Sequence, residues 1–398
     1  MGLEIYLDNA AATSVDSKVK KEMEKYFLKE YGNPGSFNTV GLRAKEAVDT
    51  ARKKVAKIIV AAPGEIIFTG SGTESINLAI KGTARVLKKK GKGNHIITST
   101  IEHHAVLDTC KYLADEEGFE VTYVKVNKFG LVDPKDVEAA IKGSTILISI
   151  MYANNEIGTI QPVSEIGRIA RKHNILFHTD ACQAGMLDLN VERLNVDLMT
   201  LNGNKIYGPK GTGMLYVKKG TPIQPIVHGG GQEFGLRSGT ENVAGIVGFA
   251  TALEIVRKEK EKEAKRLVKL RDQLIRGVLK IPKTILNGHP TKRLPNNVNI
   301  SILNVEGESI LLELNEYGIC AASGSACTSK SLDPSHVLLA IGLPAEIAHG
   351  SLRFTLGKRT TGKDVDKVIK TLPRVVQRLR ELSPVSIEMK NGVVKVKK

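Results

Sequence analysis

The sequence predicts an α/β protein in which a large domain with a mostly parallel sheet is joined to a smaller α+β domain. Between residues 65 and 217, short apolar segments alternate with helical segments, a pattern typical of parallel sheets covered on both faces. A long helical segment, polar in its middle, follows at residues 246–280 and is expected to cross between the domains. With 398 residues, 41% of them hydrophobic, the chain can form one large core and a smaller one.

The expected elements follow from apolar periodicity and from the Gly and Pro residues that interrupt it. The first part of the chain is predicted to form strand 4–7 and helices 15–31 and 42–59. In the alternating region we expect, in order, strand 65–69, helix 76–90, strand 95–98, helix 105–117, strand 120–126, helix 134–140, strand 145–151, helix 163–173, and strands 176–179, 198–201 and 213–217. After the long helix we expect strands 297–302 and 351–356 and helices 309–317, 334–341 and 362–382.

We place the large domain at residues 15–260 and the small domain at residues 1–14 and 261–385. Residues 386–398 form a basic tail. In this tail, Asn391-Gly392 lies between two alternating segments, which indicates a β-hairpin, although a frayed tail would have the same composition.

The formal net charge of +16 favours an anionic cofactor, an acidic protein partner or nucleic acid. Much of the excess is spread over helices of mixed sign, such as residues 257–276, where Lys, Arg and Glu alternate as on a solvated helix face. We find no helix-turn-helix motif, no set of zinc ligands and few aromatic residues, so nucleic-acid binding is not expected. No apolar run is long enough to span a membrane, and no signal peptide is recognisable. The four cysteines form no Cys-x-x-Cys pair, which indicates a reducing, cytoplasmic location.

The segment at residues 201–213 is organised around a lysine. Lys205 follows a predicted strand and lies among small and polar residues, including Asn202 and Asn204. A lysine in this setting can form a Schiff base with a carbonyl compound, and pyridoxal phosphate is the usual one. A surface lysine without a catalytic role is the alternative.

Other candidate site residues also follow predicted strands. Gly70-Ser71-Gly72-Thr73 precedes a helix and fits a phosphate site, although a Gly-rich turn with a capping Ser or Thr would have the same residues. Asp180 could hold a pyridinium nitrogen protonated, or it could cap a helix. His103 could stack on an aromatic cofactor, and Asn155 and Arg353 suit a substrate carboxylate.

Residues 321–330 form a long segment of small residues that contains one cysteine, Cys327. We interpret Cys327 as a nucleophile, whereas Cys320, beside Ile319, is the better candidate for a structural cysteine. Together, these segments describe a pyridoxal-phosphate enzyme whose thiol attacks an amino-acid substrate.

The sequence resembles the cysteine desulfurases of the NifS/IscS type, which are class V aminotransferase-like proteins. The resemblance runs from Tyr6 to Leu382, and its motifs occur in family order: YLDNA, FTGSGTES, EHHAVL, NNEIGTIQP, HTDACQ, KIYGPKGTG, LRSGTEN, SGSACTS and SLRFTLG. It implies a pyridoxal-phosphate-dependent homodimer of fold-type I (aspartate-aminotransferase-like) that converts L-cysteine into L-alanine. It also implies that the sulfur remains as a persulfide, for transfer to an iron–sulfur scaffold protein or for thiolation of tRNA or cofactors.

The resemblance also implies roles for individual residues. Lys205 matches the Schiff-base lysine, Cys327 the persulfide-forming nucleophile and His103 the residue that stacks on the ring. Asp180 matches the partner of the ring nitrogen, and Gln183 the residue near the ring hydroxyl. No metal site is expected within the chain, although Cys327 could ligate a cluster together with a scaffold partner.

The phosphate and the substrate carboxylate have their own matches. Gly72 and Thr73 match the phosphate loop, and Thr240 matches a phosphate contact made from the other subunit. Asn155 and Arg353 match the residues that bind the substrate carboxylate.

The chain departs from the family pattern just before the lysine. Where relatives usually have Ser-x-His-Lys, this chain has Asn202 and Asn204, which offer N–H donors but no charge-assisted hydrogen bond to a phosphate. We therefore expect an effect on cofactor affinity. Two other functions stay open: a selenocysteine lyase or other C–S lyase on the same scaffold, and a scaffold-binding sulfur carrier with weakened catalysis.

Overall fold

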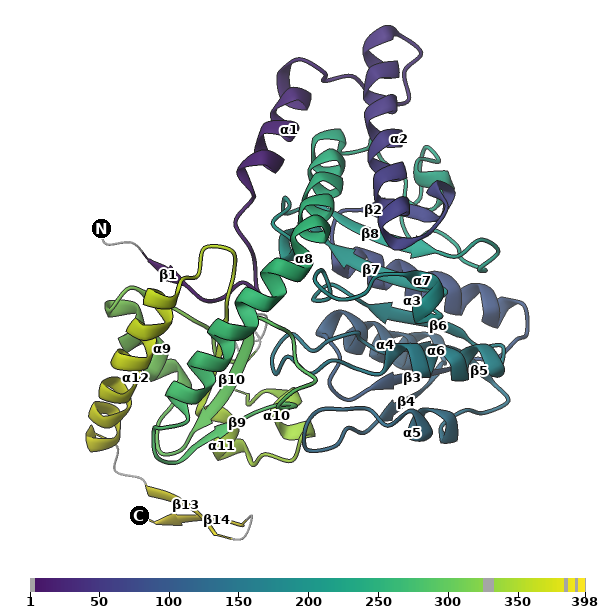
Figure 1. Cartoon of the computed structure of the whole chain (residues 1–398). Coiled ribbons are helices and arrows are strands. Elements are labelled where there is room, and N and C mark those ends of the chain that lie inside the picture. Colours follow the sequence, from purple (N-terminus) through teal and green to yellow (C-terminus); the bar gives the residue numbers. More distant parts are fainter. Residues whose placement is uncertain (1–3, 325–332, 383–385, 391–392, 398) are drawn as a thin grey trace.

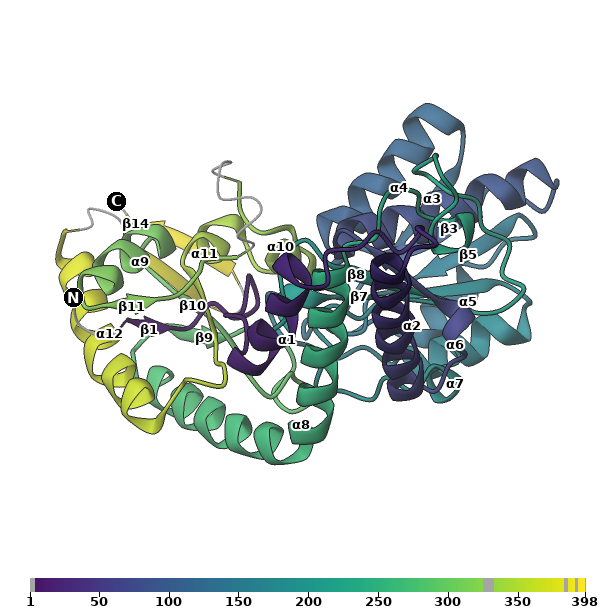
Figure 2. The same cartoon turned by 90° about the horizontal axis from the view of Figure 1, so that it is seen from above.

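In the computed structural model the protein has two lobes, and helix α8 (Val243–Val278) runs from one lobe into the other (Figures 1 and 2). The structure describes residues 4–324, 333–382, 386–390 and 393–397. Phe249 and Leu253, in the first half of α8, belong to the core of the larger lobe, and Leu267 and Leu274, in its second half, belong to the core of the smaller lobe. One continuous helix therefore fixes how the two cores are joined.

The larger lobe is built on a seven-stranded sheet with the strand order β2-β8-β7-β6-β5-β3-β4. Its strands are β2 (Ile66–Thr69), β3 (His95–Ser99), β4 (Glu120–Val124), β5 (Thr145–Ser149), β6 (Leu176–Asp180), β7 (Leu198–Asn202) and β8 (Gly213–Val217). Strand β8 is antiparallel to β2 and β7, and every other neighbouring pair is parallel. The prediction of a mostly parallel sheet is confirmed.

Helices cover both faces of this sheet because its side chains alternate between two cores. In β2, Ile66 and Phe68 belong to one core and Ile67 belongs to the other. The Ile67 face is covered by α3 (Gly72–Lys89) and α4 (His104–Glu117). The opposite core contains the first half of α8 and residues of α1 (Ser17–Leu28), α2 (Thr39–Ile59), α5 (Pro134–Ala139), α6 (Val163–Lys172) and α7 (Val191–Leu194).

The smaller lobe is formed by both ends of the chain. Its antiparallel sheet has the order β12-β10-β9, and a separate parallel pair joins β1 to β11. These strands are β1 (Ile5–Tyr6), β9 (Thr284–Leu286), β10 (Asn297–Ile302), β11 (Ile319–Cys320) and β12 (Ser351–Thr355). Its helices are α9 (Gly307–Glu316), α10 (His336–Ala340), α11 (Ala345–His349) and α12 (Gly362–Leu382).

Beyond α12, β13 (Ser386–Lys390) pairs antiparallel with β14 (Val393–Lys397). This is the region in which the sequence predicts a hairpin, and the expected turn at Asn391-Gly392 lies outside the described residues. Among the residues that the structure describes, no helix is long and apolar enough to cross a membrane.

The expected elements differ from the structure in a few places. The sequence missed β9, β11, α7 and α11, which have two to five residues each and are too short to show a periodicity. The expected start of helix 76–90 was wrong, because α3 begins at Gly72 and is capped by Ser71, whose hydroxyl accepts a hydrogen bond from the Glu74 N–H at 3.1 Å. Gly72 and Thr73 therefore lie in the first turn of a helix and not in a loop before it.

Candidate active site

The candidate site lies where several strands of the main sheet end. Parallel strands present their carboxyl ends at one edge, which is where α/β proteins bind ligands. Asp180 is the last residue of β6 and Asn202 the last of β7, while His103 follows β3 and Asn155 follows β5. The topology therefore brings four separate sequence motifs to the same edge.

These residues line one cavity of about 300 Å³, which we call the site cavity. Ten of the predicted site residues line it, which leaves out only Thr240 and Cys327. The ten are Gly72, Thr73, His103, Asn155, Asp180, Gln183, Asn202, Asn204, Lys205 and Arg353. Thr240 is exposed on the surface and does not line the cavity, and Cys327 lies outside the described residues.

The Lys205 ammonium is held at the wall of the site cavity by the N-terminal segment of the chain. Its Nζ donates hydrogen bonds to the carbonyl oxygens of Ala10 at 2.8 Å and Ala11 at 2.5 Å. The same segment is joined to the lysine loop at Thr13, whose backbone N–H and hydroxyl both donate to the Asn204 carbonyl. Residues near the start of the chain thus orient the lysine, which the sequence does not indicate.

Asp180 and Gln183 line the same cavity, and Gln183 also contacts this segment. Asp180 is only 7% exposed, and its Oδ1 accepts a hydrogen bond from the Cys182 N–H at 2.9 Å. No helix begins directly after Asp180: the next one, α7, begins at Val191 and is capped by Asn190, so the helix-cap alternative is wrong. The Gln183 amide donates to the Ala10 carbonyl at 3.1 Å, which adds a second contact to the oxygen that holds Lys205.

The first turn of α3 forms a wall suited to an anion. Its leading N–H groups have no partner within the helix, and the helix dipole favours negative charge there. A Cβ placed on Gly72 would lie 2.8 Å from Cys182 Sγ and 3.3 Å from the Asn202 amide nitrogen. Only glycine therefore lets the backbone come this close to Cys182 and Asn202 at the cavity wall.

His103 is oriented by its position at the start of α4. Its Nδ1 accepts a hydrogen bond from the Ala105 N–H at 3.0 Å, which assigns the proton to Nε2 in the neutral ring. The preceding residue, Glu102, is completely buried, and burial raises its pKa to about 8. The Glu102 carboxylate accepts two hydrogen bonds, one from the Ser99 hydroxyl at 2.6 Å and one from the Met151 N–H at 2.9 Å. Both offset part of this rise in pKa.

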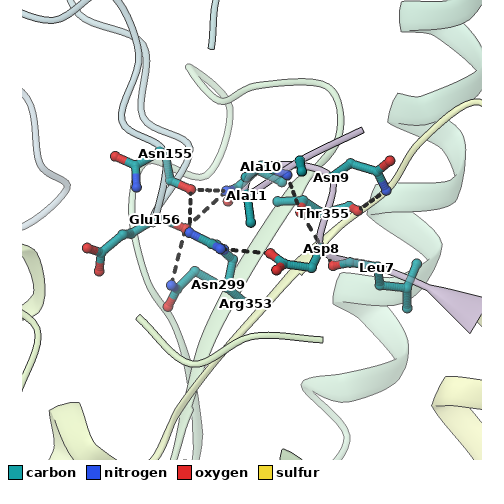
Figure 3. Close-up of polar contacts among 12 residues, drawn as sticks. Leu7, Asp8, Asn9, Ala10, Ala11, Asn155, Glu156, Asn299, Arg353 and Thr355 are labelled. Carbon is teal, nitrogen blue, oxygen red and sulfur yellow. Dashed lines mark hydrogen bonds and ion pairs between the residues drawn. The ribbon is translucent and has the colours of Figure 1, made fainter. Parts of the chain in front are cut away.

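Arg353, on β12, adds a guanidinium to the site cavity, and Figure 3 shows its contacts. The residue is 1% exposed, and its Nη2 pairs with the Asp8 carboxylate at 2.8 Å. Its Nη1 donates to the Asn155 carbonyl at 3.3 Å, so the two predicted carboxylate binders are in direct contact. The guanidinium is fixed by the N-terminal segment and by the turn after β5.

Comparison with known proteins gives consistent matches over nearly the whole chain. Residues 5–368 match the family described as Aminotransferase class-V. The cysteine desulfurase IscS of Methanosarcina thermophila is 54% identical over 383 residues, covering 96% of this chain and 94% of the relative. The IscS of Dictyoglomus turgidum is 51% identical over 392 residues, covering 98% and 99%. The chain belongs to the cysteine desulfurases of the class-V aminotransferase family.

Solved structures agree with this membership. A NifS-like protein superimposes with a TM-score of 0.89 at 41% identity, over 95% of this chain and all of that one. A structure described as SspA in complex with cysteine gives a TM-score of 0.78 at 35% identity, over 88% and 98%.

The class-V family implies pyridoxal phosphate, and the residues present fit that group. Two polar atoms of cavity-lining residues, Asn204 Oδ1 and Arg353 Nε, are buried without a hydrogen-bond partner among the described residues. An unpaired buried polar atom costs about 1–3 kcal/mol, which a polar ligand can offset. The lysine, the buried aspartate and the helix N-terminus around the same cavity match the carbonyl, the ring nitrogen and the phosphate of the cofactor.

Sequence reasoning assigned no role to three residues that complete the site. Asp8 pairs with Arg353, and the carbonyl groups of Ala10 and Ala11 hold Lys205. All three belong to the YLDNA segment and its continuation, which carries part of the resemblance. The segment itself was the available signal, but its partners are far away in sequence.

Proposed function

We propose that this cysteine desulfurase converts L-cysteine into L-alanine and leaves the sulfur as a persulfide on Cys327. The observation that carries the proposal is the joint placement of the Lys205 amine, the Asp180 carboxylate and the Arg353 guanidinium around one cavity. Cysteine as the substrate is supported by SspA, the structural relative described in complex with cysteine.

Pyridoxal phosphate would be held by the Lys205 amine, by Asp180 at the ring nitrogen and by Gly72, Thr73 and Asn202 around the phosphate. When bound, it supplies an electron sink for the bonds at the substrate's α-carbon.

The chain's own residues account for the other requirements of the reaction. Arg353 and Asn155 bind and orient the substrate carboxylate, since a guanidinium and an amide donate well-directed hydrogen bonds to carboxylate oxygens. Lys205 removes the α-proton and delivers a proton on the way to alanine, and His103 moves protons near neutral pH.

The Cys327 thiolate attacks the substrate sulfur. A sulfur–sulfur bond forms, the carbon–sulfur bond of cysteine breaks, and the β-carbon gains a proton to give alanine. Sulfur is oxidised from the thiol to the persulfide level while the β-carbon is reduced, so no external oxidant is needed.

The persulfide would then supply iron–sulfur cluster assembly or thiolation. The net charge of +16 supports an acidic scaffold protein as the acceptor. We also propose a homodimer in which Thr240 reaches the phosphate of the other subunit. Large apolar side chains on α1, on the connection to α2 and near Thr240 are exposed in the single chain, which supports a second copy as their cover: Phe27, Leu28, Tyr31, Phe37 and Phe234.

A visible spectrum of the purified protein, before and after L-cysteine is added, tests the cofactor and the substrate together. The expected result is a yellow protein whose absorbance changes on addition of cysteine, with one alanine formed for each persulfide. Cys327→Ala should keep the spectral change and lose the protein-bound persulfide. Persulfide formation at the wild-type rate in this variant would contradict the assignment, and preferential release of selenide from selenocysteine would favour a selenocysteine lyase.

A further inference from the structure

Glu156 follows Asn155 in the turn after β5, but its carboxylate makes a contact of its own. The residue is 1% exposed, and its Oε2 accepts a hydrogen bond from the Ser335 hydroxyl at 2.5 Å. Ser335 in turn caps α10 and accepts from the Leu338 N–H at 3.3 Å. The Glu156 carboxylate therefore fixes the chain two residues after residue 333, where the described structure resumes.

The same carboxylate lies beside the other end of the segment that carries Cys327. Gly324 is buried, and a Cβ placed on it would lie 3.6 Å from Glu156 Oε2 and 3.3 Å from Ser335 Cβ. Gly324 and Ser335 flank residues 325–332, so both flanking residues lie near one buried carboxylate, which is hydrogen-bonded to Ser335. Two residues before Gly324, Ala322 exchanges backbone hydrogen bonds with Arg353, which ties this end to the substrate-binding strand.

The backbone of Glu156 is fixed from the smaller lobe. Its carbonyl oxygen accepts hydrogen bonds from the side-chain amides of Asn297 at 3.0 Å and Asn299 at 3.2 Å, both on β10. Its N–H donates to Asn154 Oδ1 at 2.9 Å. Figure 3 shows its side chain directed away from the Arg353 guanidinium, so the carboxylate does not occupy the arginine that the substrate needs.

We propose that Glu156 is a positioning residue that holds the Ser335 end of the Cys327 segment at a fixed place beside the site cavity. The proposal rests on the proposed function, in which Cys327 accepts the sulfur. Asn155 lines the cavity while Glu156, bonded directly to it, anchors the segment, so the substrate contact and the anchor cannot shift independently. The backbone of Arg353 holds the Ala322 end and Glu156 holds the Ser335 end. A segment held at both ends has a restricted reach, and this raises the effective concentration of the thiol at the substrate.

The test separates cysteine binding from sulfur transfer in the holoenzyme. Binding is read from the cysteine concentration that gives half of the spectral change. Transfer is read in a single turnover, by alkylating the protein and measuring the Cys327 persulfide by mass spectrometry. The variants are Glu156→Ala, Glu156→Gln, Ser335→Ala and the double variant Glu156→Ala/Ser335→Ala, and Glu165→Ala serves as a control because Glu165 is an exposed carboxylate on α6.

We expect Ser335→Ala and Glu156→Ala each to slow persulfide formation about tenfold or more, the effect of losing one hydrogen bond to a charged group. Glu156→Gln should slow it less, because an amide oxygen still accepts from the Ser335 hydroxyl. The double variant should be no slower than Glu156→Ala, since both changes remove the same contact. Half-saturation by cysteine should change less than about twofold in Ser335→Ala, whose side chain does not line the cavity.

Three outcomes would overturn the inference while leaving the proposed function intact. The first is persulfide formation at the wild-type rate in both Ser335→Ala and Glu156→Ala. The second is a double variant in which the two single effects multiply. The third is cysteine binding that weakens in Ser335→Ala in parallel with sulfur transfer. If Glu156→Ala does not fold, Ser335→Ala and Glu156→Gln decide the question. Absence of any persulfide on Cys327 in the unmodified protein would instead refute the proposed function.

Discussion

Gly72→Ala should weaken cofactor binding with little change elsewhere. The added Cβ would lie 2.8 Å from Cys182 Sγ, whereas ordinary contacts between heavy atoms of side chains are about 3.5–4.0 Å. With the Cys182 side chain held in its position, relief of this contact requires a shift of roughly 0.7 Å at the first turn of α3. A hydrogen bond of about 2.9 Å lengthened by this amount is no longer a hydrogen bond.

The loss is therefore about one hydrogen bond to a charged group, or roughly 1.5–3 kcal/mol, which corresponds to an affinity about 10- to 150-fold lower. The assay is titration of the apo-protein with pyridoxal phosphate, followed by visible absorbance, since the chain contains no tryptophan for a fluorescence signal. Gly64→Ala is the matched control, because a Cβ at Gly64 would meet no atom within 4 Å.

The double variant Gly72→Ala/Cys182→Ala tests the cause. Removal of the Cys182 sulfur makes room for the new methyl group, so most of the lost affinity should return. The reasoning would be refuted if Gly72→Ala bound the cofactor as tightly as the unmodified protein, or if the second substitution restored nothing.

Three further predictions concern single ionisable groups. Lys205→Ala should remove the visible absorbance of the bound cofactor, while Lys210→Ala, an exposed lysine in the same segment, should retain it. Arg353→Lys should raise the KM for cysteine about 10-fold or more with a smaller effect on kcat, because one ammonium cannot replace the planar guanidinium; an equal rise in Arg359→Lys, on the exposed surface, would contradict this. Burial raises the pKa of Glu102 from 4.5 to about 8, so its contribution to stability is complete below pH 4.5 and is lost as the pH rises toward 8. In the unmodified protein, the free energy of unfolding measured by urea denaturation should therefore fall by roughly 3 kcal/mol between pH 4.5 and 7, and Glu102→Gln should not show this fall. The same pH slope in both proteins would refute the buried-acid explanation.

Local pattern was enough to place most helices and strands of this protein within a few residues. The alternation of apolar strands such as Thr145–Ser149 with amphipathic helices such as Val163–Lys172 is a property of neighbouring residues, and so are the breaks at Gly and Pro. The start of α3 was misplaced because Gly72 and Thr73 suit a loop and a helix N-terminus equally well. The strand Ile319–Cys320 has two residues and carries no pattern, since its existence depends on β1, more than 300 residues earlier in the chain.

The sequence by itself determined which site residues follow strands of the main sheet and so gather at its carboxyl edge, because strand ends mark that edge and the family motifs follow them. Only the tertiary structure decided what holds those residues in place. Asp8 fixes Arg353 from 345 positions away, the Ala10 carbonyl fixes Lys205 from 195 positions away, and Glu156 meets Ser335 across 179 positions. Each contact joins a side chain to a partner that is adjacent only after both lobes have folded, and no local periodicity or propensity encodes such a pair.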